Sequence, residues 1–308
     1  MATLFLSLLF GYWDHSCAHG DGHRASMQAQ AGYSNITQSV RWSVEDDWQA
    51  ARDHNLGVVL MWPYDLWLTI DVDRPIMWDT PVWGGAAIQF AQTVLAHRDQ
   101  IVAINVMDEP DCNYNGATFP HGWTVDNCQR QAAKIEANIA TVQTVFPNTL
   151  TWVSYTAAWV NYLQFDRPSR FGVSLATADW AGFDAYTPFT ACFGRITCPQ
   201  LWDGLQRWMT SAQKLVLIPR AFDANYLGWN PAPSEVSVMA WQYYAYSRGN
   251  PRVAAIFPFI WWNALGVGAA QVPEIRTTYE QIGVLLTGRP GPTPLPPPGI
   301  VTGLRIVH

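Results

Sequence analysis

The amino-acid sequence predicts an α/β protein with the (β/α)8 TIM-barrel architecture, followed by a Pro-rich linker. Short apolar runs, each long enough for a strand and too short for a helix, alternate with helix-like segments along the chain. The runs are apolar throughout, which is typical of parallel strands that helices cover on both faces. Residues 1–287 suffice for eight β/α units, because such a barrel takes about 250 residues.

The elements follow from these runs and from the segments between them. The eight strands are expected at 4–10, 35–42, 56–62, 101–107, 149–155, 180–186, 214–219 and 253–262. The clearest helices are expected at 44–54, 84–98, 125–146, 201–213, 234–248 and 273–286. We interpret the first run as a strand and not as a signal peptide, because it lacks a basic n-region and a small-residue cleavage site. A doubly wound sheet is the alternative, but no Gly-rich phosphate loop follows the first strand.

Composition limits the partners and the location. The net charge of −6 argues against nucleic-acid binding, and no apolar run reaches the roughly 18 residues that a membrane span needs. We also expect a monomeric protein, extracellular or virion-associated, that needs no cofactor. The barrel is expected over 1–287 and a Pro-rich linker over 288–299, with 300–308 forming either a tail or the first strand of a β-sandwich module.

The five cysteines leave at least one unpaired. Cys192 and Cys198 are placed to close a short loop, and Cys112 and Cys128 to brace a longer one. Disulfides of this kind indicate an oxidising compartment.

Carboxylates and aromatic residues follow the predicted strands at their carboxyl ends, where barrel enzymes assemble their sites. Aromatic faces stack on sugar rings, and carboxylates bind hydroxyls or catalyse cleavage of the glycosidic bond. The candidate substrate-binding residues are Asp14, Trp62, Tyr64, Asp65, Asp108, Tyr155, Tyr186, Arg220, Trp261 and Trp262. The set predicts a site for a polysaccharide or an oligosaccharide.

The segment IVAINVMDEPD (101–111) resembles the fourth strand of clan A glycoside hydrolases, which ends in Asn-Glu-Pro with the Glu as general acid/base. Glu109 and Pro110 match that motif, whereas Asp108 replaces the Asn. The segments 180–189 and 253–263 are similar to the sixth and eighth strands of the same barrels. The resemblance implies a glycosidase with Glu109 as its general acid.

The strand at 214–219 departs from that family, because LVLIPRAFDAN lacks the Glu that serves there as the nucleophile. Asp184 and Asp223 are the candidate partners of Glu109, with Asp184 preferred. Whether the reaction retains or inverts the anomeric configuration stays open, because the distance between the carboxyl groups decides it.

Two other functions compete with hydrolysis by carboxylates. The missing Glu is compatible with a non-catalytic barrel that binds glycans through its aromatic rim. The alternating ligand-type residues His15, Cys17, His19, Asp21 and His23 are compatible with a metal-dependent hydrolase, although their Gly-rich spacing favours a flexible loop.

Overall fold

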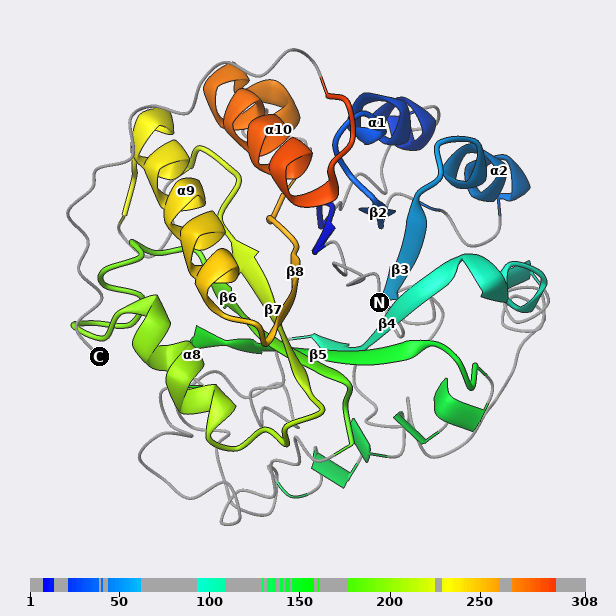
Figure 1. Ribbon diagram of the computed structural model, residues 1–308, viewed down its shortest axis with the longest axis horizontal. Coiled ribbons are helices and arrows are strands. Elements are labelled where there is room, and N and C mark those ends of the chain that lie inside the picture. The colour runs from blue at the N-terminus through cyan, green and yellow to red at the C-terminus, as the bar shows by residue number, and fades with distance from the viewer. Residues whose placement is uncertain are drawn as a thin grey trace, which may run out of the picture.

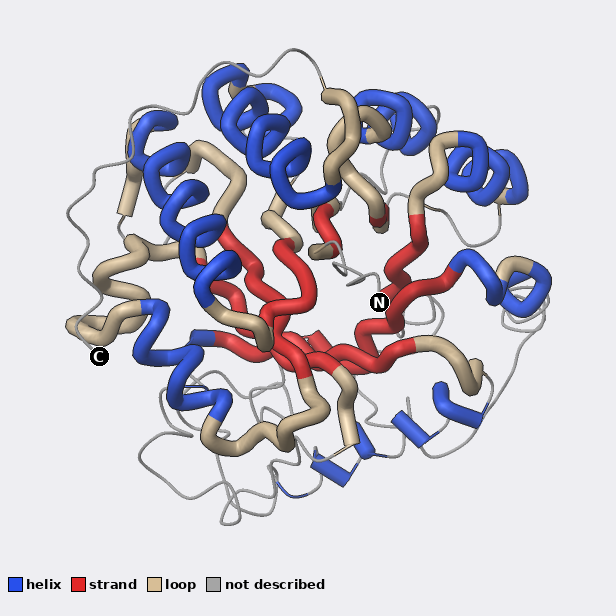
Figure 2. The backbone as a smooth tube through the Cα atoms, viewed as in Figure 1, coloured by secondary structure: helices blue, strands red, loops and turns tan. Residues whose placement is uncertain are grey.

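The strands pair into a parallel sheet that curves into a nearly closed barrel, with helices around it (Figures 1 and 2). The strand order is β1-β8-β7-β6-β5-β4-β3-β2, and each pairing is parallel. The predicted (β/α)8 TIM-barrel fold is thereby confirmed. The computed structural model describes residues 8–13, 22–38, 40, 44–61, 93–108, 129, 132–133, 135–136, 139–140, 142–144, 146–157, 160, 177–224, 229–260 and 268–291.

Each strand lies within or across one of the predicted apolar runs. The bounds are β1 Leu9–Phe10, β2 Ile36–Thr37, β3 Gly57–Met61, β4 Ile101–Asp108, β5 Leu150–Thr156, β6 Trp180–Ala185, β7 Lys214–Pro219 and β8 Val253–Ile256. β8 is shorter than expected because Pro258 has no amide hydrogen to donate. The sheet hydrogen bonds nevertheless continue past its end, since Phe257 N–H donates to Leu217 O at 2.8 Å and Phe259 N–H donates to Pro219 O at 2.9 Å.

The helices include one that the sequence did not predict. Their bounds are α1 Gly22–Gln30, α2 Glu45–Asp53, α8 Cys198–Gln206, α9 Pro233–Gly249 and α10 Pro273–Thr287, with 3-10 turns η2 Arg98–Gln100 and η3 Ala269–Gln271. α8 starts before the expected residue 201 because Thr197 and Gln200 form a capping box. α10 ends at Gly288, whose φ of 69° is readily adopted by glycine. The unexpected helix is α1, which covers residues taken for a loop.

Side chains alternate between two apolar layers on either side of the barrel wall. One layer joins strand residues to helix residues such as Trp48, Trp202 and Tyr279, so it lies between the barrel and the helices. The other contains no helix residue among those described and therefore fills the barrel interior. The interior cluster consists of Trp13, Ile36, Val59, Ala103, Trp152, Trp180, Tyr186, Val216, Ile218, Phe222, Ala255, Phe257 and Ile260.

The side chain of Asn35 joins the two ends of the sheet, β1 and β2. Its Oδ1 accepts a hydrogen bond from Phe10 N–H at 2.7 Å, and its Nδ2 donates to Leu8 O at 3.3 Å. Gly11 permits this close approach, since a Cβ at that position would lie 2.2 Å from Ile36 O. Asn35 therefore takes part in closing the barrel where no β1–β2 strand pair is described.

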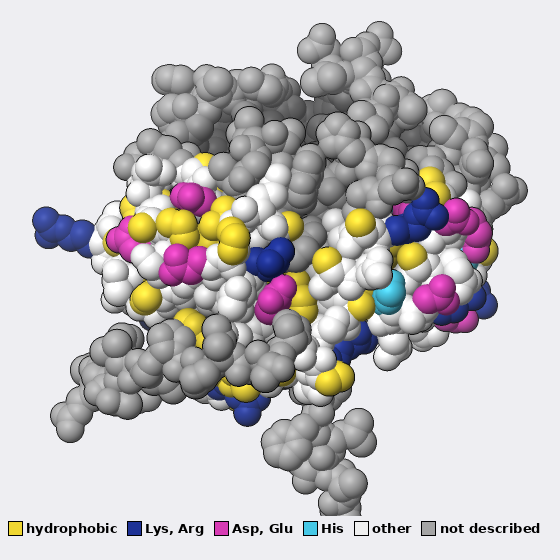
Figure 3. Space-filling model, turned by 90° about the horizontal axis from the view of Figure 1, so that it is seen from above, with side chains coloured by type: hydrophobic (Ala, Val, Ile, Leu, Met, Phe, Trp, Pro, Cys, Tyr) yellow, Lys and Arg dark blue, Asp and Glu magenta, His cyan; other side chains and the backbone are white. Residues whose placement is uncertain are grey.

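The surface is mixed in charge, and the start of the predicted linker is held against the barrel. In the face shown in Figure 3, acidic and basic side chains are interspersed with hydrophobic ones. The guanidinium of Arg289 donates to Ala31 O at 2.7 Å and to His54 O at 3.0 Å, next to the ends of α1 and α2. Among the described residues, no helix is both long and apolar enough to cross a membrane.

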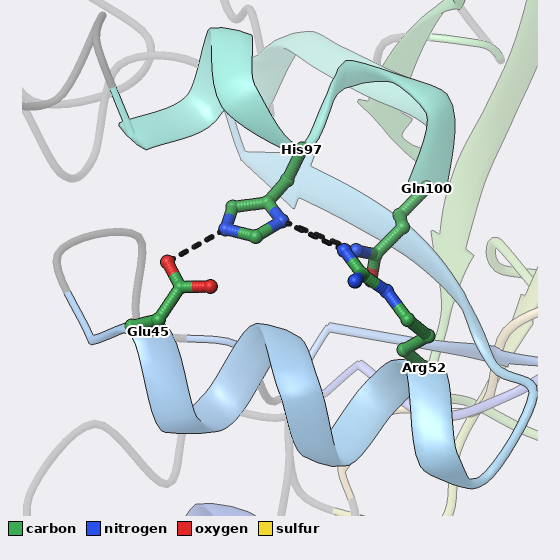
Figure 4. A network of polar contacts seen from close by, with 4 residues as sticks. All are labelled: Glu45, Arg52, His97 and Gln100. Carbon is green, nitrogen blue, oxygen red and sulfur yellow. Dashed lines mark hydrogen bonds and ion pairs between the residues drawn. The ribbon is translucent and has the colours of Figure 1, made fainter.

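A buried histidine connects α2 to the turn before β4 (Figure 4). His97 stacks on Trp48 with ring centroids 4.8 Å apart and an interplanar angle of 9°. Its Nε2 lies 2.8 Å from Glu45 Oε2, and its Nδ1 contacts Gln100 and Arg52 at 3.2 and 3.3 Å. Because the carboxylate of Glu45 is largely exposed, we expect the stack and the enclosed ring to stabilise this junction more than the ion pair.

We expect His97→Ala to lower the free energy of unfolding by about 2 kcal/mol, because it removes a stacked ring from a buried site. Denaturant unfolding of the variant measures this loss. The control is His54→Ala at the half-exposed end of α2, where we expect a change within about 0.5 kcal/mol. Equal losses in the two variants would contradict this role of His97.

Candidate active site

The carboxyl end of the barrel brings together residues that are far apart in the sequence. Asp108 ends β4, while Tyr186 follows β6 and Arg220 follows β7 directly. Beyond the strands, isolated parallel β-bridges pair Phe259, after β8, with Trp13, after β1, and with Arg220, after β7. The continuations of these three strands therefore also meet here. Since all the strands are parallel, these residues lie at one end of the barrel.

Asp184 lies on the inner face of β6. It lies four residues after Trp180 and two before Tyr186, on the same face as these two residues of the interior cluster. It pairs in register with Thr156 of β5 and Ile218 of β7. Its exposed fraction is 9%. Asp184 therefore presents a largely enclosed carboxyl group near the carboxyl end of the barrel interior.

Aromatic rings also pack against one another inside the barrel. Trp13 meets Trp152 edge to face with ring centroids 5.2 Å apart, and Trp152 meets Phe257 in the same way at 5.5 Å. These rings form a packed layer within the barrel.

A second aromatic group follows the strand ends. Tyr186 stacks on Phe259 at 5.0 Å, and Phe222 meets the two rings edge on at 5.6 and 5.9 Å. Tyr186 and Phe222 are each 7% exposed. The predicted residue Tyr186 thus belongs to a preformed aromatic cluster beside Asp184.

Arg220 is enclosed by protein groups, in contrast to the exposed rim position that sugar binding would need. Its exposed fraction is 0%. Nε donates to Phe222 O at 2.9 Å and Nη1 donates to Tyr186 O at 3.2 Å. The guanidinium carbon lies 4.2 Å from the centroid of the Phe222 ring and 5.0 Å from that of Trp229. The guanidinium of Arg220 is therefore bound by main-chain carbonyls and aromatic rings of the protein itself.

Tyr155 lies in the layer between the barrel and the helices, and not with the interior residues. It is 0% exposed and packs in the outer cluster with Val153 and Phe183. Burial raises the pKa of its phenol well above the usual value, with a smaller contribution from Glu136. The structure therefore separates Tyr155 from Asp184 by the barrel wall, and its predicted contact with sugar does not enter the proposal below.

The remaining predicted residues fall into two groups. Asp223 is half-buried and follows Phe222, and the backbone of Asp108 pairs in register with Ser154 of β5. The others lie outside the described residues: Asp14, Trp62, Tyr64, Asp65, Glu109, Trp261 and Trp262.

Part of the predicted metal loop is helical. His23 lies in α1 and is 3% exposed, so it is a buried helix residue. His15, Cys17, His19 and Asp21 lie outside the described residues. In the part of the chain that the structure covers, no group of three metal-ligating side chains comes together.

The predicted Cys192–Cys198 disulfide is present, and it joins the loop after β6 to the first residue of α8. Thr187 Oγ1 donates to Cys192 O at 2.6 Å, which joins this loop to the segment after β6. Cys112 and Cys128 lie outside the described residues. The disulfide therefore braces the chain that follows Asp184 and Tyr186.

Two buried helix tyrosines, which sequence reasoning missed, hold the strand ends. Tyr243 of α9 donates to Ala185 O at 3.1 Å, and Tyr279 of α10 donates to Arg220 O at 2.7 Å. Burial raises the pKa of Tyr243 well above its usual value, and the nearby charges of Tyr279 and Asp184 raise it further by smaller amounts. Both phenols stay protonated at neutral pH and act as donors. Helical periodicity marks them as buried but does not reveal their acceptors.

Comparison of the chain with family models and with curated protein sequences gives no match. Solved structures do match. A β-glucuronidase from Bacteroides uniformis has a TM-score of 0.57 at 10% identity, over 91% of this chain. An endo-β-1,3-glucanase (GH128, subgroup II) from Pseudomonas viridiflava has a TM-score of 0.53 at 12% identity, over 89% of this chain and 97% of its own.

The likeness is one of fold. Xylanase 10B from Thermotoga maritima has a TM-score of 0.50 at 10% identity and matches over 90% of this chain and 96% of its own length. The chain spans about a third (35%) of the β-glucuronidase, but almost the whole of the glucanase and the xylanase. All three have the barrel that the described strands form.

Proposed function

We propose that this protein is a glycoside hydrolase that cleaves a polysaccharide, with Glu109 as the general acid and Asp184 as the second carboxylate. The observation that carries the proposal is the enclosed carboxyl group of Asp184 on the inner face of β6, next to the Tyr186–Phe222–Phe259 aromatic cluster. Barrels of this fold that cleave polysaccharides, a glucanase and a xylanase, support it by analogy.

We expect Glu109 to lie near Asp184. Glu109 follows Asp108, the last residue of β4, directly in the chain, and Asp184 lies two strands away on β6. Since neighbouring strands are about 4.8 Å apart, the two backbones are roughly 10 Å apart. The proposal requires the carboxyl group of Glu109 to turn toward the barrel interior, at one of the separations from Asp184 of about 5–9.5 Å that glycosidases use.

The reaction then follows from the two carboxyl groups. Glu109 donates a proton to the glycosidic oxygen as the bond to the anomeric carbon breaks. Asp184 either attacks that carbon as the nucleophile or removes a proton from the attacking water. Tyr186 is proposed to line the site as part of the buried aromatic cluster. Aromatic faces for sugar are proposed to come from residues outside the described part, Trp62, Tyr64, Trp261 and Trp262. Asp14, Asp65 and Asp108 are proposed to bind hydroxyls.

The organisation and location of the chain are part of the same proposal. We place the catalytic barrel at 1–287 and the Pro-rich linker at 288–299, before a tail or further module at 300–308. The Cys192–Cys198 disulfide is compatible with an oxidising, extracellular location.

Release of reducing ends from a panel of polysaccharides tests the proposal. The panel contains β-1,3-glucan, xylan, cellulose, mannan and a uronate-containing glycan. We expect the wild-type protein to release reducing ends from at least one of them, and Asp184→Asn to release none above background. Binding to a glycan without release of product would favour the non-catalytic glycan-binding barrel instead. Loss of activity with a chelator would favour the metal-dependent hydrolase.

A further inference from the structure

We infer that Arg220 is a positioning residue, which fixes the segment carrying Asp184 and Tyr186 and does not bind the substrate. This inference rests on the proposed function. Arg220 has the residue type that recognises an acidic sugar, but it is 0% exposed and two of its guanidinium nitrogens donate to main-chain carbonyls. Because the side chain is enclosed and its Nε and Nη1 are bound to the main chain, the guanidinium is held within the protein, which favours a positioning role over substrate binding.

The carbonyls that Arg220 holds belong to the two segments that leave the barrel beside Asp184. Nη1 donates to the carbonyl of Tyr186, two residues after Asp184, and Nε donates to that of Phe222. One planar group thereby joins the continuation of β6 to that of β7. Arginine suits this task because its donors form a rigid fork, whereas a lysine ammonium is a single point on a flexible stem.

The surrounding contacts fix Arg220 itself. Tyr279 donates to its carbonyl at 2.7 Å, and the rings of Phe222 and Trp229 flank its guanidinium at 4.2 and 5.0 Å. Tyr243 holds the neighbouring carbonyl of Ala185 at 3.1 Å. The two consecutive carbonyls after Asp184 are therefore both hydrogen-bonded by side chains from other elements, which leaves the backbone at Asp184 little freedom to move.

The proposal predicts a loss in the chemical step and not in binding. A catalytic group that moves by about 1 Å costs on the order of 10²-fold in rate. We expect Arg220→Lys to lower kcat by about 10²-fold and to leave KM within about twofold, on neutral and uronate-containing substrates alike. The preference of the enzyme between these substrates should not change.

Arg252→Lys is the matched control. Arg252 also donates to main-chain carbonyls, those of Gln206, Thr210 and Gln213, but it lies before β8, at the amino end of the barrel. We expect it to lower the melting temperature as Arg220→Lys does, with kcat unchanged below the transition. If the two variants lose kcat equally, or if Arg220→Lys keeps full kcat, the positioning role is wrong. A rise of KM confined to uronate-containing substrates would show that Arg220 binds substrate and would overturn the inference.

Hydrogen exchange separates this inference from the proposed function. Peptides covering residues 180–190 should exchange faster in Arg220→Lys than in the wild type or in Arg252→Lys, whether or not the protein hydrolyses any glycan. Unchanged exchange there would overturn the inference, while failure of every polysaccharide in the panel would overturn the proposed function alone. If Arg220→Lys does not fold, Tyr243→Phe removes the donor to Ala185 O, together with the contact between the hydroxyl and Cys198 Sγ at 3.5 Å. The same exchange and kcat measurements apply to it.

Discussion

Glu109→Gln is expected to reduce kcat on the polysaccharide substrate by about 10³-fold, because a carboxamide does not transfer a proton to the leaving oxygen. KM should change little, since glutamine keeps the size of the side chain. Initial rates of reducing-end release measure both constants.

The matched control for Glu109 is Glu274→Gln, the same substitution at an exposed position in the first turn of α10. It should leave kcat unchanged. Full activity of Glu109→Gln on a true substrate would remove Glu109 from the mechanism. A substrate with a good leaving group, such as an aryl glycoside, should restore part of the rate of Glu109→Gln because it needs less acid assistance.

Asp184→Asn is expected to cause a loss of similar size, about 10³-fold in kcat, whereas Asp223→Asn should keep most of the activity. The two variants should differ because the residues lie in different places. Asp184 is on the inner face of β6 and 9% exposed, whereas Asp223 is half-buried beyond the end of β7. Both variants are assayed on the same substrate, with circular dichroism to confirm that each is folded.

The opposite ranking, with Asp223→Asn inactive and Asp184→Asn active, would transfer the second catalytic role to Asp223. The anomer that forms first, observed by proton NMR with the wild-type enzyme, then distinguishes the two mechanisms. Retention indicates that the second carboxylate is a nucleophile, and inversion indicates that it activates water.

The strands could be predicted from the sequence because burial on both faces leaves an unmistakable apolar run. The run at 214–219 coincides with β7, Lys214–Pro219. The same property hides which way each side chain points, since an apolar residue is compatible with either layer. Tyr155 was expected at the site for that reason. In the structure Tyr155 faces the helices and its neighbour Ser154 lies toward the interior, hydrogen-bonded to Asn105 at 3.1 Å.

α1 could not be predicted because its buried face is largely polar. His23, Ser26, Met27 and Gln30 are all buried and have the i, i+3, i+4, i+7 spacing of one helix face, but only Met27 is apolar. The spacing of His15–His23 therefore looked like that of a ligand loop. The role of Arg220 was hidden for another reason, because its acceptors are main-chain carbonyls, which every residue carries.

The structure of the Glu109→Gln variant with a bound, uncleaved oligosaccharide tests the central claim most directly. The account predicts that the sugar crosses the carboxyl end of the barrel, with the glycosidic oxygen within about 3 Å of the substituted side chain at position 109. The Asp184 carboxyl group should lie on the other side of the same anomeric carbon. An oligosaccharide bound at another face, or with its glycosidic bonds out of reach of both side chains, would contradict the account.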